Sequence, residues 1–438
     1  MKILSRSSCR SLLVRFTLLC SLLIASVTQA QLRIEITEGS MRPTKIAIPP
    51  FGGTLSSGIE EIIQNDLRSS GLFQSMGKSD LLAPYPAKES EIIYRDLRAV
   101  GADYILIADG VSSDVGQTVN WSLFDVASQR KVKGQQLSGA LSQTRDMAHQ
   151  ISDAVYEAIT GIRGAFRTRL VFVRDVGPSV RKRYQLVMTD ADGERPRTLF
   201  SSADPLLSPT WSNDGRKIAY VSFETSRPAI FVHEISNGLR QQVTNYKGLN
   251  GAPAFSPDDR RLALVLSKDG NPEIYIMDLA SRNLTRLTKT RDAIIDTEPA
   301  WSADGKFIYF TSNRGGNPQI YRISSTGGKA ERVTFAGDYN ARPKLSADGR
   351  TMVMVNRTND NFHIAWQDLE TGDTRILTKT DLDESPTIAP NSAMVLYATK
   401  KSGRDVLAAV SMDAGARFFL PSNNGAVREP AWSPFPAE

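Results

Sequence analysis

The stretch Pro209-Thr-Trp-Ser-Asn-Asp-Gly215 recurs along the second half of the chain at a nearly constant interval. Related stretches follow as Pro253-Ala-Phe-Ser-Pro-Asp-Asp259 and Pro299-Ala-Trp-Ser-Ala-Asp-Gly305. The copies begin at Pro209, Pro253, Pro299, Pro343, Pro386 and Pro430, so successive copies are 43 to 46 residues apart. A repeat of this length, with room for four short strands, is typical of the blades of a β-propeller.

The interior of each unit has the composition of a tight turn followed by a buried strand. The Asp-Gly pair predicts the turn, because an aspartate side chain bonds nearby backbone and glycine accepts a positive φ. Apolar runs such as residues 262–266 follow and barely alternate, which is typical of a strand covered on both faces. We therefore interpret the repeated aspartates as turn formers rather than as a carboxylate ring. They are Asp214, Asp258, Asp304 and Asp348.

The two ends of the repeat array are each incomplete. Residues 170–173, 186–187 and 198–199 predict three strands with no Pro-x-Trp-Ser before them, whereas nothing strand-like follows Pro430-Ala-Trp-Ser433. Together they make one blade. The sequence thus predicts an all-β six-bladed β-propeller over residues 166–438, closed by a blade shared between the two ends of that domain.

Residues 31–165 have a different pattern, which predicts an α/β N-terminal domain. Residues 32–36 alternate as a strand does, with Leu32, Ile34 and Ile36 on one face and Arg33 and Glu35 on the other. Later segments have the 3.6-residue period of amphipathic helices, and one of these is expected to end near residue 161. A second helix is expected over residues 88–100.

Residues 1–30 have the pattern of a signal peptide: basic residues, then an apolar run too short to span a bilayer, then small residues. Cleavage would remove four of the 53 basic residues, none of the 47 acidic residues and both cysteines. The exported chain would then carry 49 basic against 47 acidic residues. This near-balance gives no reason to expect a nucleic-acid partner, and we predict no membrane span in the exported chain.

Catalytic motifs are missing from the sequence. His149, His233 and His363 fall in one predicted helix and two different blades, without metal-ligand spacing, so we interpret them as ordinary surface or core histidines. Nucleophile-elbow and nucleotide-binding motifs do not occur either. We predict a protein that is not an enzyme, with no catalytic residues, metal site or cofactor. Two alternatives remain, an envelope hydrolase using carboxylates such as Glu298 and a carbohydrate-binding propeller.

Charged residues precede the repeated prolines. If each proline opens a strand that lines the central channel, these residues lie at one mouth of that channel. Two interpretations stay open, a solvated rim or a mixed-charge ring that accepts a partner's loops or a metal ion. The residues are Asp296, Glu298, Arg342, Asp383, Glu384, Arg428 and Glu429.

Several stretches closely resemble the TolB family, over essentially the whole chain after residue 30. They are Gly161-Ile-Arg-Gly-Ala-Phe-Arg-Thr-Arg169, Asn250-Gly-Ala-Pro-Ala-Phe-Ser256, Leu382-Asp-Glu-Ser-Pro386 and Pro430-Ala-Trp-Ser-Pro434. The resemblance implies a non-enzymatic, periplasmic component of the Tol-Pal system, which supports outer-membrane integrity and constriction during cell division. The implied partners are the peptidoglycan-associated lipoprotein (Pal) and the inner-membrane protein TolA, with other envelope proteins, colicins or phage proteins as further partners.

The resemblance also implies which residues bind these partners. The lipoprotein is expected at the propeller mouth and TolA at the N-terminal segment, an alternating strand suited to adding onto another sheet. Leu249 departs from the polar residue expected at its position, so one lipoprotein contact differs here. The mouth residues that the resemblance implies are Ala252, Thr297 and Glu298, to which we add Arg342, Asp383 and Glu384 from their place before the repeated prolines. Those of the N-terminal segment are Leu32, Arg33, Ile34, Glu35 and Ile36.

Overall fold

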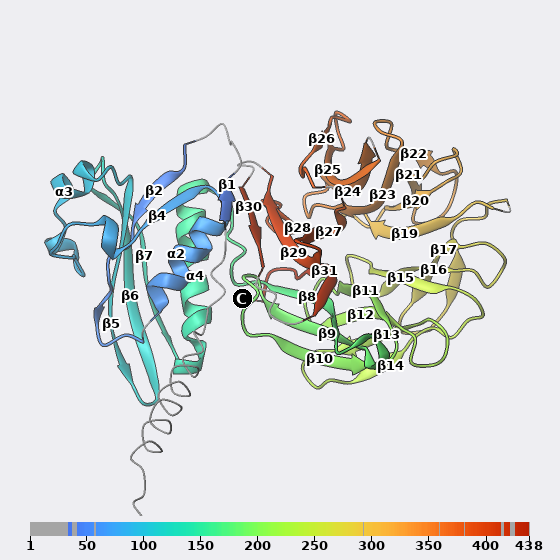
Figure 1. Cartoon of the computed structure of the whole chain (residues 1–438), viewed down its shortest axis with the longest axis horizontal. Helices are drawn as coiled ribbons and strands as arrows, with labels where there is room; N and C mark the ends of the chain where they lie inside the picture. The colour runs from blue at the N-terminus through green and yellow to red at the C-terminus, as the bar shows by residue number, and fades with distance from the viewer. Residues whose placement is uncertain are drawn as a thin grey trace, which may run out of the picture. The chain divides into compact units, whose positions relative to one another are not determined.

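The computed structural model describes residues 34–36, 42–56, 58–291, 293–358, 360–380, 382–412, 416–420 and 425–437 (Figure 1). The expected signal peptide, together with Leu32 and Arg33, lies outside the described residues. Contacts group the described residues after Gln31 in one compact unit. None of the helices in the described ranges is long and apolar enough to cross a membrane.

The first part of this unit is a mixed sheet with strand order β4-β2-β5-β6-β7, in which β3 also pairs with β5. Strand β2 pairs in parallel with β4 and β5, whereas β5, β6 and β7 form an antiparallel meander. The strands are β2 (Thr44–Ala47), β3 (Gly52–Gly53), β4 (Phe73–Met76), β5 (Tyr104–Ser113), β6 (Gly116–Asp125) and β7 (Arg130–Gly139). The helices are α2 (Ile59–Ser69), α3 (Tyr94–Ala99) and α4 (Thr144–Thr160), with short 3-10 turns η1 (Lys78–Asp80), η2 (Glu89–Glu91), η3 (Leu141–Gln143) and η4 (Ser179–Arg181).

Helices α2 and α4 share one hydrophobic core with the sheet. Ile63 and Leu67 of α2 and Ile151 and Val155 of α4 are fully buried, at the i, i+4 spacing that places each pair on one helical face. Helix α4 stops at Gly161, whose φ of 74° gives a left-handed cap. The expected end of this helix is therefore confirmed.

The helix expected over residues 88–100 is interrupted, so that prediction is wrong in its first half. Glu91 accepts hydrogen bonds from the backbone N–H groups of Ala87 (2.8 Å) and Lys88 (3.2 Å), which closes η2 as a short turn. Ile92 then takes an extended conformation, with ψ of 118°. Helix α3 begins only at Tyr94.

The remainder of the unit is a six-bladed β-propeller, as predicted. Five blades follow one another along the chain, and their antiparallel strands are consecutive in sequence. These blades are β11 (Leu206–Trp211), β12 (Lys217–Ser222), β13 (Ala229–Glu234) and β14 (Arg240–Gln242); β15 (Asn250–Phe255), β16 (Arg261–Leu266), β17 (Glu273–Asp278) and β18 (Leu284–Arg286); β19 (Asp296–Trp301), β20 (Phe307–Ser312), β21 (Gln319–Ser324) and β22 (Glu331–Arg332); β23 (Tyr339–Leu345), β24 (Thr351–Thr358), β25 (Asn361–Asp368) and β26 (Thr374–Ile376); and β27 (Glu384–Ile388), β28 (Met394–Lys401), β29 (Arg404–Ser411) and β30 (Ala416–Phe419).

The sixth blade joins the two ends of the propeller, which confirms the predicted shared closure. Its strand order is β10-β9-β8-β31, formed by β8 (Arg169–Val176), β9 (Arg183–Asp190), β10 (Arg197–Ser202) and β31 (Ala426–Trp432). Strand β31 pairs antiparallel with β8, with Trp432 opposite Leu170. The Trp432 Nε1 donates to Thr168 Oγ1 at 2.7 Å, and the backbone N–H of Arg169 donates to Ser433 Oγ at 2.9 Å. These bonds join residues more than 260 positions apart.

The turn between the first two strands of a blade has the chemistry expected from the repeat. Asp214 Oδ1 accepts hydrogen bonds from Ser212 Oγ at 2.6 Å and from the backbone N–H of Arg216 at 2.9 Å. Gly215 has a φ of 69°, in the left-handed region that glycine tolerates. The role of the repeated aspartate as a turn former is confirmed at this position.

The N-terminal strand pairs with the propeller instead of the α/β sheet. Strand β1 (Ile34–Ile36) is antiparallel to β30, with Ile34 opposite Phe418 and Ile36 opposite Ala416 (Figure 1). Its assignment to the α/β domain is therefore corrected at the level of backbone pairing. The outer edge of β30 offers unpaired backbone groups that a short alternating strand satisfies.

Candidate functional site: the channel mouth

The six innermost propeller strands share an unusual backbone conformation. The residue directly before each repeated proline has a positive φ, and in every blade the register with the next strand shifts across it. These φ values are 51° at Ser208, 45° at Ala252, 56° at Glu298, 57° at Arg342, 54° at Ser385 and 49° at Glu429. A non-glycine residue held there stores about 1–3 kcal/mol of strain, and such strain concentrates at functional sites. We call these six residues the bulge ring.

The bulge ring corrects one detail of the sequence interpretation. Strand β15 begins at Asn250, three residues before Pro253, so the proline lies inside the innermost strand and does not open it. The proline follows a β-bulge, where a ladder hydrogen bond is already lost.

The bulge ring and the prolines behind it line an open cavity of about 570 Å³, which we call the channel mouth. Thr210 and Lys344 complete its wall. Ala252, Glu298 and Arg342 line the mouth, which is the location predicted for them from the sequence. None of its described lining residues is a histidine, a cysteine or an aromatic residue.

Hydrogen bonds across blade boundaries join members of the bulge ring. Glu298 Oε1 pairs with Arg342 Nε at 2.9 Å, and Glu298 Oε2 accepts the Arg342 backbone N–H at 3.0 Å. The Arg342 guanidinium also donates to Ser385 Oγ in the following blade. Across the closing blade, Glu429 accepts the backbone N–H of Ser208. Charged side chains therefore hold adjacent blades together at the mouth while part of their surface faces solvent.

Both signs of charge meet in the channel mouth. Burial opposes ionisation of Arg342, but the carboxylates of Glu298 and Glu429 outweigh it and raise the pKa of the guanidinium. Burial, followed by repulsion from Arg342, lowers the pKa of Lys344. A partner that brings a carboxylate or backbone carbonyls would relieve the crowding of the two cations.

Two of the predicted charged residues lie beneath the surface of the mouth. Asp383 is fully buried, and its carboxylate accepts hydrogen bonds from the hydroxyls of Thr378 and Thr380, the latter at 2.6 Å. Asp296 is equally buried and pairs with Arg314 at 2.6 Å. The expectation that Asp383 is presented at the mouth is therefore wrong, because its oxygens are engaged inside the blade.

Exposed apolar side chains precede three of the six innermost strands, and the sequence interpretation had singled out only Leu249 among them. The exposed fractions of Leu249, Ile295 and Leu382 are 39%, 46% and 44%. The residue after each is polar and buried, and it lies at the start of β15, at the start of β19 or directly before β27. Large exposed apolar residues on loops are frequent in protein-binding surfaces. Aligning the six repeats on their prolines would have revealed the shared position.

The other predicted residues are placed as follows. Thr297 is half-buried beside Glu298, and Glu384 is exposed at the start of β27. Ile34, Glu35 and Ile36 form β1.

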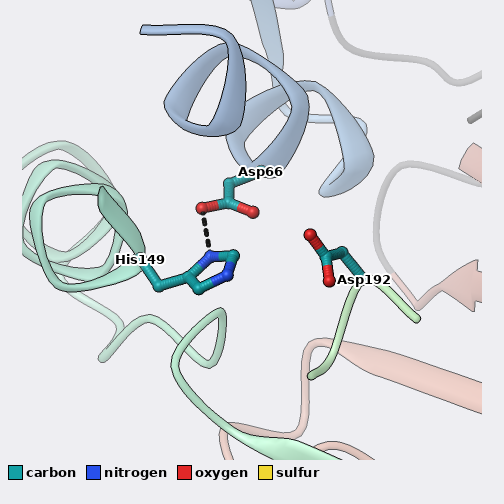
Figure 2. A group of neighbouring side chains, drawn as sticks. All are labelled: Asp66, His149 and Asp192. Carbon is teal, nitrogen blue, oxygen red and sulfur yellow. Dashed lines mark hydrogen bonds and ion pairs between the residues drawn. The ribbon is translucent and has the colours of Figure 1, made fainter. Parts of the chain in front are cut away.

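Away from the mouth, the described residues contain one group whose atoms are close enough to share a cation. Asp66, His149 and Asp192 each place one atom within 4.8 Å of the others (Figure 2). Asp66 lies on α2, His149 on α4, and Asp192 in the turn between β9 and β10. His149 and Asp66 are almost fully buried, with exposed side-chain fractions of 2% and 3%.

The fold defines a six-bladed propeller protein with an N-terminal α/β domain. The family described as TolB beta propeller domain matches residues 156–436, and the TolB amino-terminal domain matches residues 32–132. The chain belongs to the TolB family.

Relatives and a solved structure agree with this assignment. The Tol-Pal system protein TolB of Pseudomonas aeruginosa is 48% identical over 97% of this chain and 99% of its own. That of Alcanivorax borkumensis is 45% identical, over 93% and 94%. The crystal structure of TolB from Acinetobacter baumannii is 43% identical, with a TM-score of 0.85, and covers 92% of this chain and 100% of its own. The chain is thus a Tol-Pal system component, and the prediction that it is not an enzyme is confirmed by this family membership.

Proposed function

We propose that this chain is a periplasmic adaptor of the Tol-Pal system. It binds the peptidoglycan-associated lipoprotein at the channel mouth and TolA through its N-terminal segment. Linking the two partners supports outer-membrane integrity and constriction during cell division. The observation that carries the proposal is the bulge ring, since all six blades hold a strained residue at the same opening.

The mouth has the properties of a surface for another protein. Its charges are partly exposed, with 36% of the Arg342 side chain and 25% of the Glu298 side chain accessible. Exposed apolar groups such as Ile295 can bury area against a partner loop, while the charges fix its orientation.

The N-terminal segment is suited to bind a partner by strand addition. Only three residue pairs join β1 to β30, and β1 is the edge strand of its five-stranded sheet. Among the described residues its other edge is unpaired, so a strand of TolA can add there through backbone hydrogen bonds. The same short pairing makes the segment easy to detach.

Lipoprotein binding tests the role of the mouth. We expect Glu298→Ala and Thr297→Ala to weaken binding of the purified lipoprotein at least tenfold in calorimetry, with the thermal midpoint nearly unchanged. Glu331→Ala is the matched control, because Glu331 forms an exposed pair with Arg322 at 3.0 Å on an outer strand. Full affinity in both mouth variants would show that the lipoprotein binds elsewhere.

TolA binding tests the role of the N-terminal segment. Deleting residues 31–42 should abolish binding of purified TolA, whereas the propeller should unfold at its usual temperature and still bind the lipoprotein. Unchanged affinity of the shortened chain for TolA would reject this part of the proposal.

Neither alternative function is supported by the mouth. The hydrolase alternative is excluded by membership in a non-enzymatic family, and the geometry agrees, because Asp383 is buried and Glu298 is paired with Arg342. The described lining of the mouth offers no aromatic face on which a sugar ring could stack, so no observation favours a carbohydrate ligand.

A further inference from the structure

A second charged region, which we call the junction, lies where α4 meets the turn between β9 and β10. This turn protrudes from the closing blade, and its charged residues pair with the first half of α4. The junction comprises Asp66, Arg145, Asp146, His149, Asp190, Asp192 and Arg195. Its ion pairs connect residues of the α/β part with residues of the propeller.

Two arginines form reciprocal pairs across the junction. Arg195 of the turn binds Asp146 of α4 at 2.6 Å and its own neighbour Asp190 at 2.7 Å. Arg145 of α4 binds Asp192 and approaches Asp190 at 3.5 Å. Each side therefore supplies both an arginine and a carboxylate, so the turn can dock in one orientation only.

His149 stands at the centre of the junction with one nitrogen bonded and one unbonded. Its Nδ1 bonds Asp66 Oδ2 at 2.8 Å, within the α/β part (Figure 2). Its Nε2 is buried and has no hydrogen-bond partner, and the nearest propeller carboxylate oxygen, Asp190 Oδ2, lies 3.9 Å away. The ring is thus positioned to bridge the two parts, provided that Nε2 carries a proton.

The oxygens around His149 do not fit a metal ion. Asp66 Oδ2 is bonded to the imidazole, and Asp192 Oδ1 accepts the backbone N–H of Glu194 at 3.1 Å. The other oxygen of Asp192 is bonded to Arg145, so a metal would have to displace a guanidinium. Without rearrangement, the positive charge that these carboxylates can accommodate is that of the protonated imidazole of His149.

The charges around His149 favour its protonated form. Burial lowers its pKa, but the adjacent carboxylate of Asp66, and then Asp192, outweigh burial and the repulsion of Arg145 and raise it to about 9. Five carboxylates and one guanidinium group act on the imidazole from α2, α4, the end of β9 and the turn, and the guanidinium of Arg195 lies behind Asp190. The carboxylates are Asp66, Asp146, Asp153, Asp190 and Asp192, and the guanidinium group is that of Arg145.

We propose that protonated His149 is a latch between the α/β domain and the propeller, in which the imidazolium joins Asp66 of α2 to Asp190 of the propeller turn. Loss of the proton leaves a neutral ring among buried carboxylates and weakens docking of the turn on α4. The latch is independent of what binds at the mouth or at the N-terminal segment.

The direction of the pH dependence follows from the raised pKa. Asp66 stays beside His149 whether or not the turn is docked, so only the part of the rise that comes from the propeller carboxylates, such as Asp192, is linked to docking. That part stabilises docking while the imidazole is protonated and is lost as the pH rises through about 9. Each unit of that part corresponds to a factor of about ten in the docking equilibrium. Burial also raises the pKa of Asp66 and that of Asp153, the latter to about 7, so part of the Asp153 titration falls inside the interval between pH 7.5 and 9.5. The contribution of His149 is therefore read as the part of the pH response that disappears in His149→Gln.

Amide hydrogen exchange on the intact protein tests the latch. The exchange rates of the amides in residues 161–168 and 190–195 are measured and divided by the rates in β20. This ratio removes the intrinsic acceleration of amide exchange with pH. We expect the relative exchange of the junction to rise severalfold between pH 7.5 and 9.5, because only the part of the pKa rise that comes from the propeller carboxylates is linked to docking. In His149→Gln the relative exchange should be high already at pH 7.5 and show a smaller further rise.

A matched histidine variant serves as the control for His149→Gln. His363→Gln, in β25 and outside the junction, should behave as the wild type does. A junction equally protected at both pH values in the wild type, or a rise retained in full in His149→Gln, would overturn the latch. If His149→Gln does not fold, an NMR titration of the wild-type imidazoles decides, because the chain has three histidines. A midpoint for His149 above about 7.5 supports the latch, and one at or below it contradicts it.

Discussion

The channel mouth and the junction are both built from carboxylates and guanidinium groups that connect separate parts of the molecule, yet they differ in access to water. At the mouth, Glu298 and Arg342 keep 25% and 36% of their side chains exposed. At the junction, His149 and Asp190 are 2% and 8% exposed. The pair at the mouth is thus partly open to solvent, whereas the junction buries His149 and Asp190 at its centre and leaves 26% of Arg145 and 37% of Arg195 exposed around them.

This difference separates the proposed binding surface from a structural contact. Exposed ion pairs contribute little to stability and can exchange their partner, whereas breaking a buried pair leaves an uncompensated charge. The mouth can therefore change partners at small cost to the fold, and the junction cannot. The predictions below test this contrast, from the largest expected effect to the smallest.

Removing residues 430–438 should have the largest effect, because the closing strand serves both regions. Strand β31 carries Glu429 at the mouth and lies in the same sheet as the strands that flank the junction turn. Without its last part, β8 loses the pairing of Trp432 with Leu170, and the ring can open. We expect loss of the cooperative thermal transition of the propeller in calorimetry. A shortened chain that melts as the full chain does would contradict closure by the shared blade.

Asp190→Asn should destabilise the protein strongly. The substitution removes the charge that faces Arg195 and Arg145, so the free energy of unfolding should fall by about 3 kcal/mol. Urea denaturation measures this change. Asp204→Asn, at an exposed position in the loop after β10, is the matched control and should lie within about 0.5 kcal/mol of the wild type. Equal effects of the two substitutions would remove the contrast between junction and surface.

Glu298→Gln should change stability much less than Asp190→Asn does. Because the pair with Arg342 is partly exposed, we expect a loss of less than about 1 kcal/mol in the same denaturation experiment. Glu331→Gln, in an exposed pair on an outer strand, should show a similarly small change. A loss as large as that of Asp190→Asn would show that the mouth is held together as tightly as the junction.

The smallest effect is expected where glycine suits the strained backbone. Ala252 has a φ of 45°, so Ala252→Gly relieves backbone strain in the folded state. Glycine also gives the unfolded chain more conformational entropy, and the two effects oppose each other. The free energy of unfolding should therefore stay within about 0.5 kcal/mol of the wild-type value. The same substitution at Ala254, two residues further along β15 without a positive φ, should cost about 1 kcal/mol. Equal losses at both positions would mean that Ala252 is not strained.

The repeat alone predicted the propeller and its shared closing blade, because the proline and turn motifs recur at fixed spacing along the chain. The bulge ring could not be predicted in this way. Its members are serine, alanine, glutamate and arginine, with no glycine to signal a positive φ. The conformation is imposed by pairing between strands and not by residue type.

Side-chain burial and contacts between residues far apart in the chain could not be predicted from the sequence either. Asp383 and Glu384 are adjacent in sequence, and only the fold shows that the first is buried and the second exposed. The partners of His149 are equally hidden from sequence patterns, because Asp66 lies 83 positions away. Spacing motifs report local structure, whereas the junction exists only after α2, α4 and the turn come together.

The most direct test of the central claim, that the mouth is the partner-binding surface, is a hydrogen-exchange footprint of the purified protein with the peptidoglycan-associated lipoprotein. We expect slower exchange on binding in the innermost strands, at residues 250–252, 296–298, 340–342 and 427–429, with no change in the outer strands β14, β18 and β22. Protection confined to the outer strands or to α2 and α4, with the innermost strands unchanged, would contradict it.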